Sequence, residues 1–247
     1  MWLGYFVHDK GIYMLLNRKE PGYPEGFEGL LPLELQAERL KAVCARLGME
    51  IDISSVPEFA KKIADIPLSE GAEGWAVVLR RNLIDSRPDA LTARELLAEG
   101  VSREMDNRIL EIDEHADRFR VSERTQEMFN HLCATQPESD ICVMQVQLGL
   151  RNAKTSDADA LQNLAKNEFG LSFLSGASIL ATHPERLGKY FDLGISFPGE
   201  EYDYDGDKAY SRTVLGKTNQ GRLMLMHFPP RIPWMNDHGA ATGFVWE

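Results

Sequence analysis

The stretch Asp140–Arg151, DICVMQVQLGLR, is the strand around which we expect the chain to fold. Ile141, Val143, Val146 and Leu148 stand among few charges, a pattern typical of a strand that is buried on most of its surface. The stretch lies near the middle of the most apolar part of the chain. Polar residues follow it, and then a segment with helical character.

An earlier segment repeats this order of elements. Both consist of a strand, a polar loop, a helix and a glycine, over 74–100 and over 140–170. The earlier strand is WAVVLRRNLI (75–84), and the later helix is expected at 157–168. The order favours an internal βα duplication. The alternative is that strand, loop and helix simply form a common succession.

Helical periodicity and helix-end residues predict the remaining helices. Pro32 opens one that continues to Leu47 and ends at Gly48, and Ser55 begins another at capping-box spacing from Glu58. Further helices are expected at 122–134 and at 171–181, LSFLSGASILA, where small residues between large ones predict a buried helix that a neighbour approaches closely.

The C-terminal part changes character after Leu187, where extended runs replace helices. Strands are predicted there at 191–197, 213–217, 223–228 and 242–246, and a short extended piece is expected earlier, at 119–121. Asn219-Gln220-Gly221 predicts a hairpin over 213–228. We therefore expect an α+β fold, a single domain over 30–247 with a mixed sheet, two strand–loop–helix units and an antiparallel C-terminal part. Residues 1–29 are expected to form an N-terminal hairpin or extension, with a helix through IYMLL as the alternative.

Composition limits the classes of partner. The net charge of −11 and the interspersed basic residues argue against a nucleic acid or an anionic membrane surface. We see no membrane span, and an N-terminus without a basic region predicts no signal peptide. The three cysteines, Cys44, Cys133 and Cys142, lack metal-ligand spacing, so we expect reduced thiols in a cytoplasmic protein.

Several of these segments together resemble an uncharacterised bacterial family, a domain of unknown function. The resemblance is carried by WAVVLRRNLI, by DICVMQVQLGLR with the following DADAL, and by LSFLSGASILATHPERL with the glycine-containing strands after it. It covers roughly 32–243, and the acidic segment 200–207 departs from it. The resemblance implies no activity and therefore no residue roles.

The segment 227–239, HFPPRIPWMNDHG, is the first candidate site. Its candidate catalytic residues are His227, Arg231, Asp237 and His238, because histidine beside a carboxylate acts as a base or a metal ligand and the prolines restrict the backbone. The spacing fits no helical zinc motif. The alternative is a proline-rich loop that packs over a sheet.

The acidic segment 200–207, EEYDYDGD, is the second candidate. Closely spaced carboxylates suit Ca²⁺ or Mg²⁺, and Asp203, Asp205 and Asp207 occupy positions 1, 3 and 5 of an EF-hand loop. Lys208 and Val214 then stand where that loop needs glycine and glutamate. A solvated acidic loop is the alternative.

Two functions follow from these observations. We favour a non-catalytic protein that binds a partner protein or a small ligand, because the sequence has no recognised catalytic or phosphate-binding motif. The alternative is a metal-assisted hydrolase that uses the C-terminal His/Asp segment. Whether the chain is an enzyme is left open. No cofactor is evident, and the residues would allow a divalent metal.

Overall fold

The computed structural model describes residues 22–81, 83, 88–102, 116–187, 192–203, 206, 212–219, 222–228 and 238–246. The helices are α2 (Leu33–Arg46), α3 (Val56–Ile63), α4 (Asp89–Leu97), α6 (Glu123–Ala134), α7 (Asp157–Gln162) and α8 (Phe173–Thr182). Short helical turns are η1 (Ala98–Ser102), η2 (Ala116–Arg118) and η3 (Pro184–Arg186). The strands are β1 (Gly74–Leu79), β2 (Phe119–Val121), β3 (Ile141–Gln147), β4 (Glu168–Gly170), β5 (Gly194–Tyr202), β6 (Arg212–Asn219), β7 (Arg222–Phe228), β8 (His238–Ala240) and β9 (Thr242–Phe244).

The first sheet is antiparallel and has the strand order β1-β3-β9-β4. All seven residues of β3 are buried, which confirms the expectation for the central strand. The strand ends at Gln147, earlier than expected. There the Gln147 side chain accepts a hydrogen bond from the Gly149 N–H (2.7 Å), and Gly149 takes a φ of +106°, so the backbone turns away.

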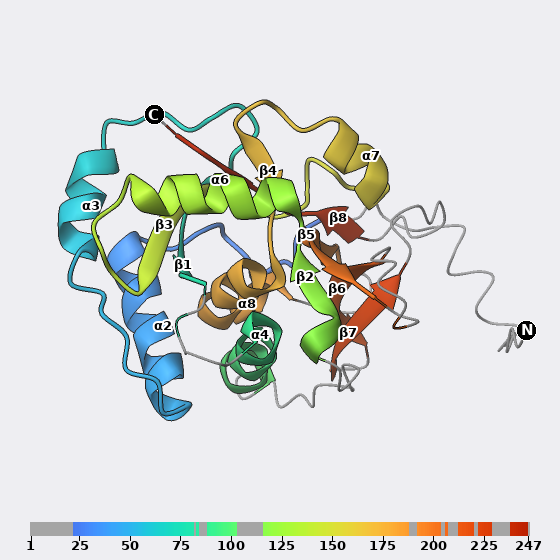
Figure 1. Ribbon diagram of the computed structural model, residues 1–247, viewed down its shortest axis with the longest axis horizontal. Coiled ribbons are helices and arrows are strands. Elements are labelled where there is room, and N and C mark those ends of the chain that lie inside the picture. The colour runs from blue at the N-terminus through green and yellow to red at the C-terminus, as the bar shows by residue number, and fades with distance from the viewer. Residues whose placement is uncertain are drawn as a thin grey trace, which may run out of the picture.

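The second sheet has the order β2-β5-β6-β7, and β8 pairs with β5 in parallel. The predicted hairpin is confirmed as the antiparallel pair β6–β7. One antiparallel sheet, one mixed sheet and the helices around them make the α+β fold that the sequence predicted (Figure 1).

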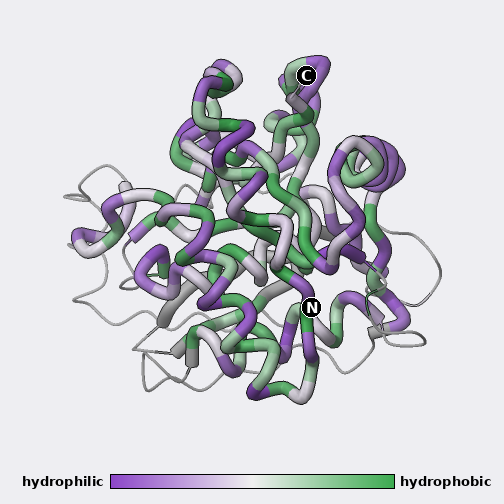
Figure 2. Tube along the Cα trace, turned by 90° about the vertical axis from the view of Figure 1, so that its left-hand side faces the viewer, coloured by the Kyte–Doolittle hydropathy of each residue, from purple (hydrophilic) through white to green (hydrophobic). Residues whose placement is uncertain are grey.

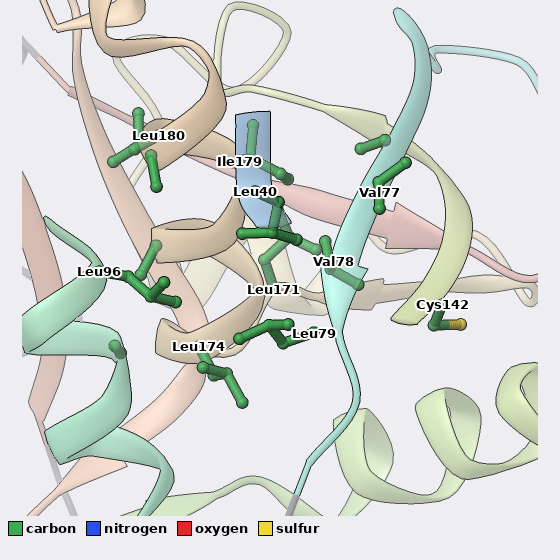
Figure 3. Packing of buried hydrophobic residues seen from close by; sticks show 14 of the residues in the cluster. Leu40, Val77, Val78, Leu79, Leu96, Cys142, Leu171, Leu174, Ile179 and Leu180 are labelled. Carbon is green, nitrogen blue, oxygen red and sulfur yellow. The ribbon is translucent and has the colours of Figure 1, made fainter. Parts of the chain in front are cut away.

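The apolar core is built around α8, whose ten residues are all buried. α2 and α8 pack against β1, and α4 packs against α8, whereas α6 contacts β3 and β4. Leucines of α4 and α8 and valines of β1 meet in this core (Figure 3). Hydrophilic stretches lie mostly on the periphery of the molecule (Figure 2). A buried α8 confirms the helix expected at 171–181.

The two sheets join where backbone lies directly against backbone. A Cβ at Gly199 of β5 would lie 2.2 Å from the Gly170 carbonyl oxygen of β4, and one at Gly239 of β8 would lie 1.9 Å from that of Gly149. Such distances admit only glycine. The Gly199 N–H also donates to the carbonyl of Leu171 (2.9 Å), so β5 is hydrogen-bonded to the residue that follows β4.

The C-terminal strand passes from one sheet into the other at Ala241. Its N–H donates to the Ser196 carbonyl (2.9 Å) in the second sheet, and its carbonyl accepts from the Leu171 N–H (3.0 Å) beside the first. β8 and β9 are therefore two halves of one extended segment that serves both sheets. Strands that change sheet in this way form the corners of packed sheets.

Several predicted elements differ from the structure. The helix expected at 157–168 ends at Gln162, and 168–170 pairs with β9 as an edge strand. The strand expected at 75–84 ends at Leu79. The acidic segment 200–207 is not wholly a loop, since its first three residues belong to β5.

The helices of the two predicted βα units pack in different places. α4 packs on α8, but α7 packs on β5 and β8, so the two helices occupy different positions; the duplication of 74–100 and 140–170 stays a prediction.

The expected N-terminal hairpin lies outside the described residues. Tyr23, in the described part of the 1–29 segment, packs against the core, and its ring lies 4.5 Å from the Arg186 guanidinium. Within the described residues, no helix combines the length and apolarity needed to cross a bilayer.

At the junction between the two sheets, one added methyl group is expected to lower the stability of the protein strongly. Gly199→Ala is expected to lower the free energy of unfolding by about 2–3 kcal/mol, because the new Cβ meets backbone atoms that cannot move aside. Gly26→Ala is the control, since nothing lies within 4 Å of a Cβ there. Urea denaturation of both variants measures the difference. Equal stability of the two variants would contradict the proposed close contact.

Candidate ligand-binding site

A pocket of about 860 Å³ opens between α6, the loop after α3 and the end of the chain after β9. Its volume lies within the range of small-molecule sites. The lining combines apolar and polar side chains: Ile66, Pro67, Leu68, Ser69, Glu127, Met128, His131, Lys166, Asn167, Val245 and Trp246. These residues come from four separate parts of the sequence.

Two amide side chains, one buried and one exposed, hold the pocket walls in place. Gln145 of β3 is fully buried, and its side chain accepts from the Ser69 N–H (2.7 Å) and donates to the Pro67 carbonyl (3.0 Å). Asn167 donates from its side chain to the Val245 carbonyl (3.0 Å), while its own carbonyl accepts from the Val245 N–H (2.8 Å). The 66–69 loop and the end of the chain are thus anchored to the first sheet.

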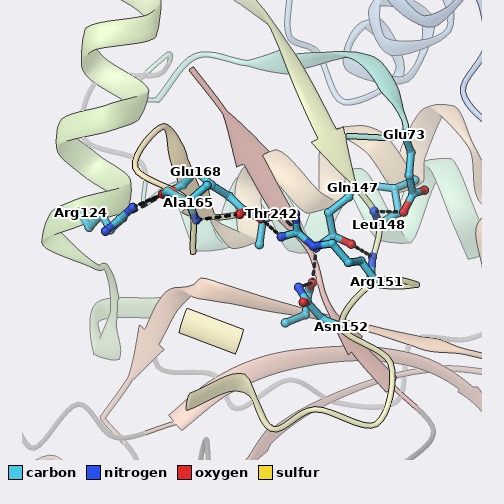
Figure 4. Close-up of polar contacts among 11 residues, drawn as sticks. Glu73, Arg124, Gln147, Leu148, Arg151, Asn152, Ala165, Glu168 and Thr242 are labelled. Carbon is cyan, nitrogen blue, oxygen red and sulfur yellow. Dashed lines mark hydrogen bonds and ion pairs between the residues drawn. The ribbon is translucent and has the colours of Figure 1, made fainter. Parts of the chain in front are cut away.

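Arg124 ties α6 to the turn that carries Lys166 and Asn167, which forms another wall of the pocket. Its guanidinium Nη2 donates to the carbonyls of Ala165 and Glu168, both at 2.7 Å (Figure 4). The turn between these carbonyls carries Lys166 and Asn167. The helix that presents one wall is therefore tied to the turn that presents another.

The apolar part of the pocket rests on an aromatic cluster. The Trp246 ring meets the rings of Phe59 and Trp75 edge to face, with centroids 5.6 and 5.3 Å apart. The Lys62 ammonium lies 5.6 Å from the centre of the Trp246 ring. Leu68 leaves 43% of its surface exposed, so part of its side chain is accessible to a ligand.

Charged and polar groups border the apolar surface. Glu127 and His131 stand one helical turn apart on α6 and so share a face. Lys166 also lines the pocket, on the turn that Arg124 of α6 binds. Side chains of both signs around an apolar surface suit a molecule with an apolar body and a charged group.

Sequence reasoning did not find this site. Its residues are dispersed over four parts of the sequence, and Trp246, for example, lies at the end of a segment that was predicted only as a strand. The available signal was Gln145, which with Gln147 is one of two amide side chains in an otherwise apolar strand. A buried amide needs hydrogen-bond partners, and here the partners are the pocket loop.

His238, predicted as a catalytic candidate, lies in β8 and is 2% exposed. Its Nε2 is 3.7 Å from Oδ1 of the buried Asp157, and the Ser196 hydroxyl donates to the same oxygen (2.7 Å). His227 lies in β7, and β5 and β6 stand between that strand and β8. Arg231 and Asp237 lie outside the described residues.

Asp203, the first of the predicted metal ligands, follows β5 and is 4% exposed. Its Oδ1 accepts from the Gly206 N–H (2.9 Å), and its own N–H donates to the Arg118 carbonyl (3.0 Å). Asp205 and Asp207 lie outside the described residues. In the part of the chain that the structure describes, no three His, Cys, Asp or Glu side chains converge on a common point.

A second polar cluster surrounds Glu168, which is 1% exposed. Its carboxylate pairs with Arg151, accepts from the Thr242 hydroxyl and accepts from the Ala165 N–H (3.1 Å) (Figure 4). Gln147 next to it donates to the Ala240 carbonyl (2.6 Å). These contacts hold the strand that changes sheet, so we interpret the cluster as structural.

Glu200 is a buried carboxyl group that the sequence did not distinguish from its acidic neighbours. It lies in β5, is 4% exposed and accepts from the Phe173 N–H (3.0 Å) in the first turn of α8. Burial raises the pKa of Glu200 to about 7, against the lowering effects of that hydrogen bond and of Arg81.

Comparisons with known proteins add no assignment. No family model matches the chain. Searches of curated proteins and of solved structures likewise found no similar one. The resemblance to a bacterial domain of unknown function therefore stays a prediction, and the function is argued from the geometry of the site.

The raised pKa of Glu200 predicts a defined pH dependence of stability. The unfolded chain loses this proton near its ordinary pKa of 4.5, whereas the folded protein keeps it up to about pH 7. The contribution of Glu200 to the free energy of unfolding is therefore fully present below pH 4.5 and is lost as the pH rises to about 7. Glu200→Gln is expected to gain stability over the wild type across this window, by roughly 2–3 kcal/mol at its upper end.

Denaturation at a series of pH values measures this effect. Glu201→Gln is the matched control, because it removes the same type of charge from the adjacent residue, whose side chain is 31% exposed and pairs with Arg120. Parallel stability curves for Glu200→Gln and the wild type between pH 4.5 and 7 would show that the Glu200 pKa is not raised.

Proposed function

We propose that this protein binds a small organic ligand, without catalysis, in the pocket between α6, the 66–69 loop and Val245–Trp246. The observation that carries the proposal is the pocket itself: its volume of about 860 Å³ and its walls anchored by Gln145 and Asn167. Walls that are hydrogen-bonded to the sheet before a ligand arrives reduce the entropy that binding must cost. The lack of a recognised catalytic motif in the sequence agrees with a binding role.

The lining indicates the chemistry of the ligand. Leu68, Met128, Val245 and Trp246 offer an apolar surface large enough for a ring system or a branched chain. Lys166, at the border, supplies a cation for a carboxylate, sulfonate or phosphate group. We therefore propose an amphipathic organic anion, with its apolar body inside and its anionic group near Lys166.

The metal-assisted hydrolase remains the second candidate. Its support is the approach of His238 Nε2 to Asp157 Oδ1, at 3.7 Å, which brings together the His and carboxylate groups that hydrolytic chemistry uses. Elemental analysis of the purified, untagged protein tests it. A stoichiometric divalent metal that is lost in His238→Ala would favour this candidate over the ligand-binding protein.

The remaining proposals concern partners and place. The free thiols of Cys44, Cys133 and Cys142 suit a reducing compartment, and we propose the cytoplasm. The net charge of −11 supports a small molecule or a protein as partner, in preference to nucleic acid or an anionic membrane. Membership of the bacterial family of unknown function is retained as a proposal.

Binding of 8-anilinonaphthalene-1-sulfonate tests the proposed site, because this probe has an aromatic body and one sulfonate. Its fluorescence should rise saturably, with one site per chain. Lys166→Ala is expected to weaken binding about five-fold, the equivalent of one exposed ion pair. Leu68→Ala should weaken binding by about ten-fold through lost apolar contact.

Two surface residues of α2 provide matched controls. Leu35 leaves 43% of its surface exposed, the same fraction as Leu68, and Lys41 is an exposed cation outside the pocket lining. Leu35→Ala and Lys41→Ala should bind the probe like the wild type. Losses as large in these controls as in Leu68→Ala and Lys166→Ala would place the probe elsewhere and contradict the proposal.

A further inference from the structure

The short connection between α6 and β3 brings two cysteines together. Cys133 lies near the end of α6 and Cys142 near the start of β3. The Gln136 side chain donates to the Val143 carbonyl (2.7 Å) and accepts from the Val143 N–H (2.9 Å). This pair of hydrogen bonds folds the connection back on the strand and keeps the two cysteines adjacent.

Arg80 fixes the same connection from the side of β1. Its guanidinium Nε donates to the Ile141 carbonyl (2.9 Å), and Nη2 donates to the Pro137 carbonyl (2.6 Å). Both acceptors flank the turn that leads to Cys142. A permanent positive charge is thus held beside the two thiols, and Cys133 and Cys142 both experience its field.

The Cys142 thiol donates weakly to the Val143 carbonyl (4.0 Å). Cys133 and Cys142 shift each other's pKa and have unequal surroundings. Cys133 is partly exposed, whereas Cys142 is fully buried. In Figure 3 the Cys142 sulfur points away from the labelled leucines. The hydrogen bond from Cys142 lowers the pKa of Cys133, aided by Arg80 and opposed by burial. Burial raises the pKa of Cys142 well above its usual range.

We propose that Cys133 and Cys142 are a thiol–disulfide exchange site, in which a small external disulfide converts the pair into a reversible intramolecular disulfide. The inference does not depend on the proposed ligand. It rests on the connection that Gln136 and Arg80 clamp between the two cysteines, which keeps the thiols adjacent, and on the different access that solvent has to each.

The exchange proceeds in two balanced steps. The Cys133 thiolate attacks one sulfur of the external disulfide, forms a mixed disulfide and releases the first external thiolate. The Cys142 thiol then gives its proton to solvent and attacks the Cys133 sulfur, which releases the second external thiolate. Two protein thiols are oxidised, one external disulfide is reduced to two thiols, and the two thiol protons pass to those products.

The assignment of roles follows from access and ionisation. The attacking thiol must be reachable and ionised, and Cys133 meets both conditions better than its buried partner. Cys142 is fully buried and cannot be reached by a bulky disulfide, but the clamped connection keeps it near the sulfur that it must attack. The third cysteine, Cys44, is buried in α2, and burial raises the pKa of its thiol to about 12, so it serves as an internal control.

Oxidised glutathione is the probe for the test. The reduced full-length protein is incubated with it at pH 8, free thiols are trapped with iodoacetamide, and tryptic peptides are weighed without reduction. Cys133 and Cys142 fall in one tryptic peptide, 125–151. The proposal expects this peptide two hydrogens lighter than its reduced form. A peptide that stays fully alkylated after prolonged incubation would overturn the proposal.

Single variants separate the roles of the cysteines. Cys142→Ala should accumulate a glutathione adduct on Cys133, because the second step is blocked, and Cys133→Ser should form neither adduct nor disulfide. Cys44→Ser should behave like the wild type. Circular dichroism verifies that each variant is folded. If Cys142→Ala is not folded, Cys142→Ser is used in its place. A folded Cys142 variant without the adduct would contradict the assignment of Cys133 as the attacking thiol.

The rates at which iodoacetamide modifies the cysteines of the wild-type protein give a further test that needs no variant. Iodoacetamide should modify Cys133 in the folded, reduced protein at least about ten-fold faster than Cys44, because thiolate fraction and access both favour it. Equal rates for the two cysteines would show that Cys133 has no special reactivity and would overturn the proposal.

Discussion

The architecture depends on one constraint, the backbone-to-backbone contact between the two sheets. Gly170 lies against Gly199 and Gly149 against Gly239, at distances that exclude any side chain. At this junction the chain can pass through Ala241 from β8 to β9 while keeping hydrogen bonds to both sheets. The same strand then delivers Val245 and Trp246 to the pocket. The position of the candidate site is therefore a consequence of how the sheets join.

Polar groups inside the first sheet position the pocket more than they stabilise the fold. A buried carboxylate such as Glu168 costs free energy to desolvate, and its contacts with Arg151, Thr242 and Ala165 offset that cost. These polar groups fix the positions of the strands and of the loop that lines the pocket. Glu168 lies on the strand beside β9, and Gln145, two residues before Gln147 on the same face of β3, holds the 66–69 loop.

The sequence predicted those parts of the molecule that local patterns determine. The central strand, the buried helix α8 and the β6–β7 hairpin follow from apolar runs, small residues and a turn, and Gly176 against the Phe197 ring accounts for the small residues of α8. The strand change at Ala241 and the pocket depend on contacts between distant segments, which local patterns do not encode. His238 attracted attention as a polar residue in a proline-rich segment, but its place in β8 is set by pairing with β5.

The central claim is that the pocket beside α6 is where this protein binds its ligand. The most direct test is to follow the amide resonances of the labelled protein by NMR during titration with 8-anilinonaphthalene-1-sulfonate. The account predicts that the shifted amides cluster in 66–69, 127–131, 166–167 and 245–246, the segments that line the pocket. Shifts concentrated in the second sheet, or scattered evenly over the chain, would contradict it.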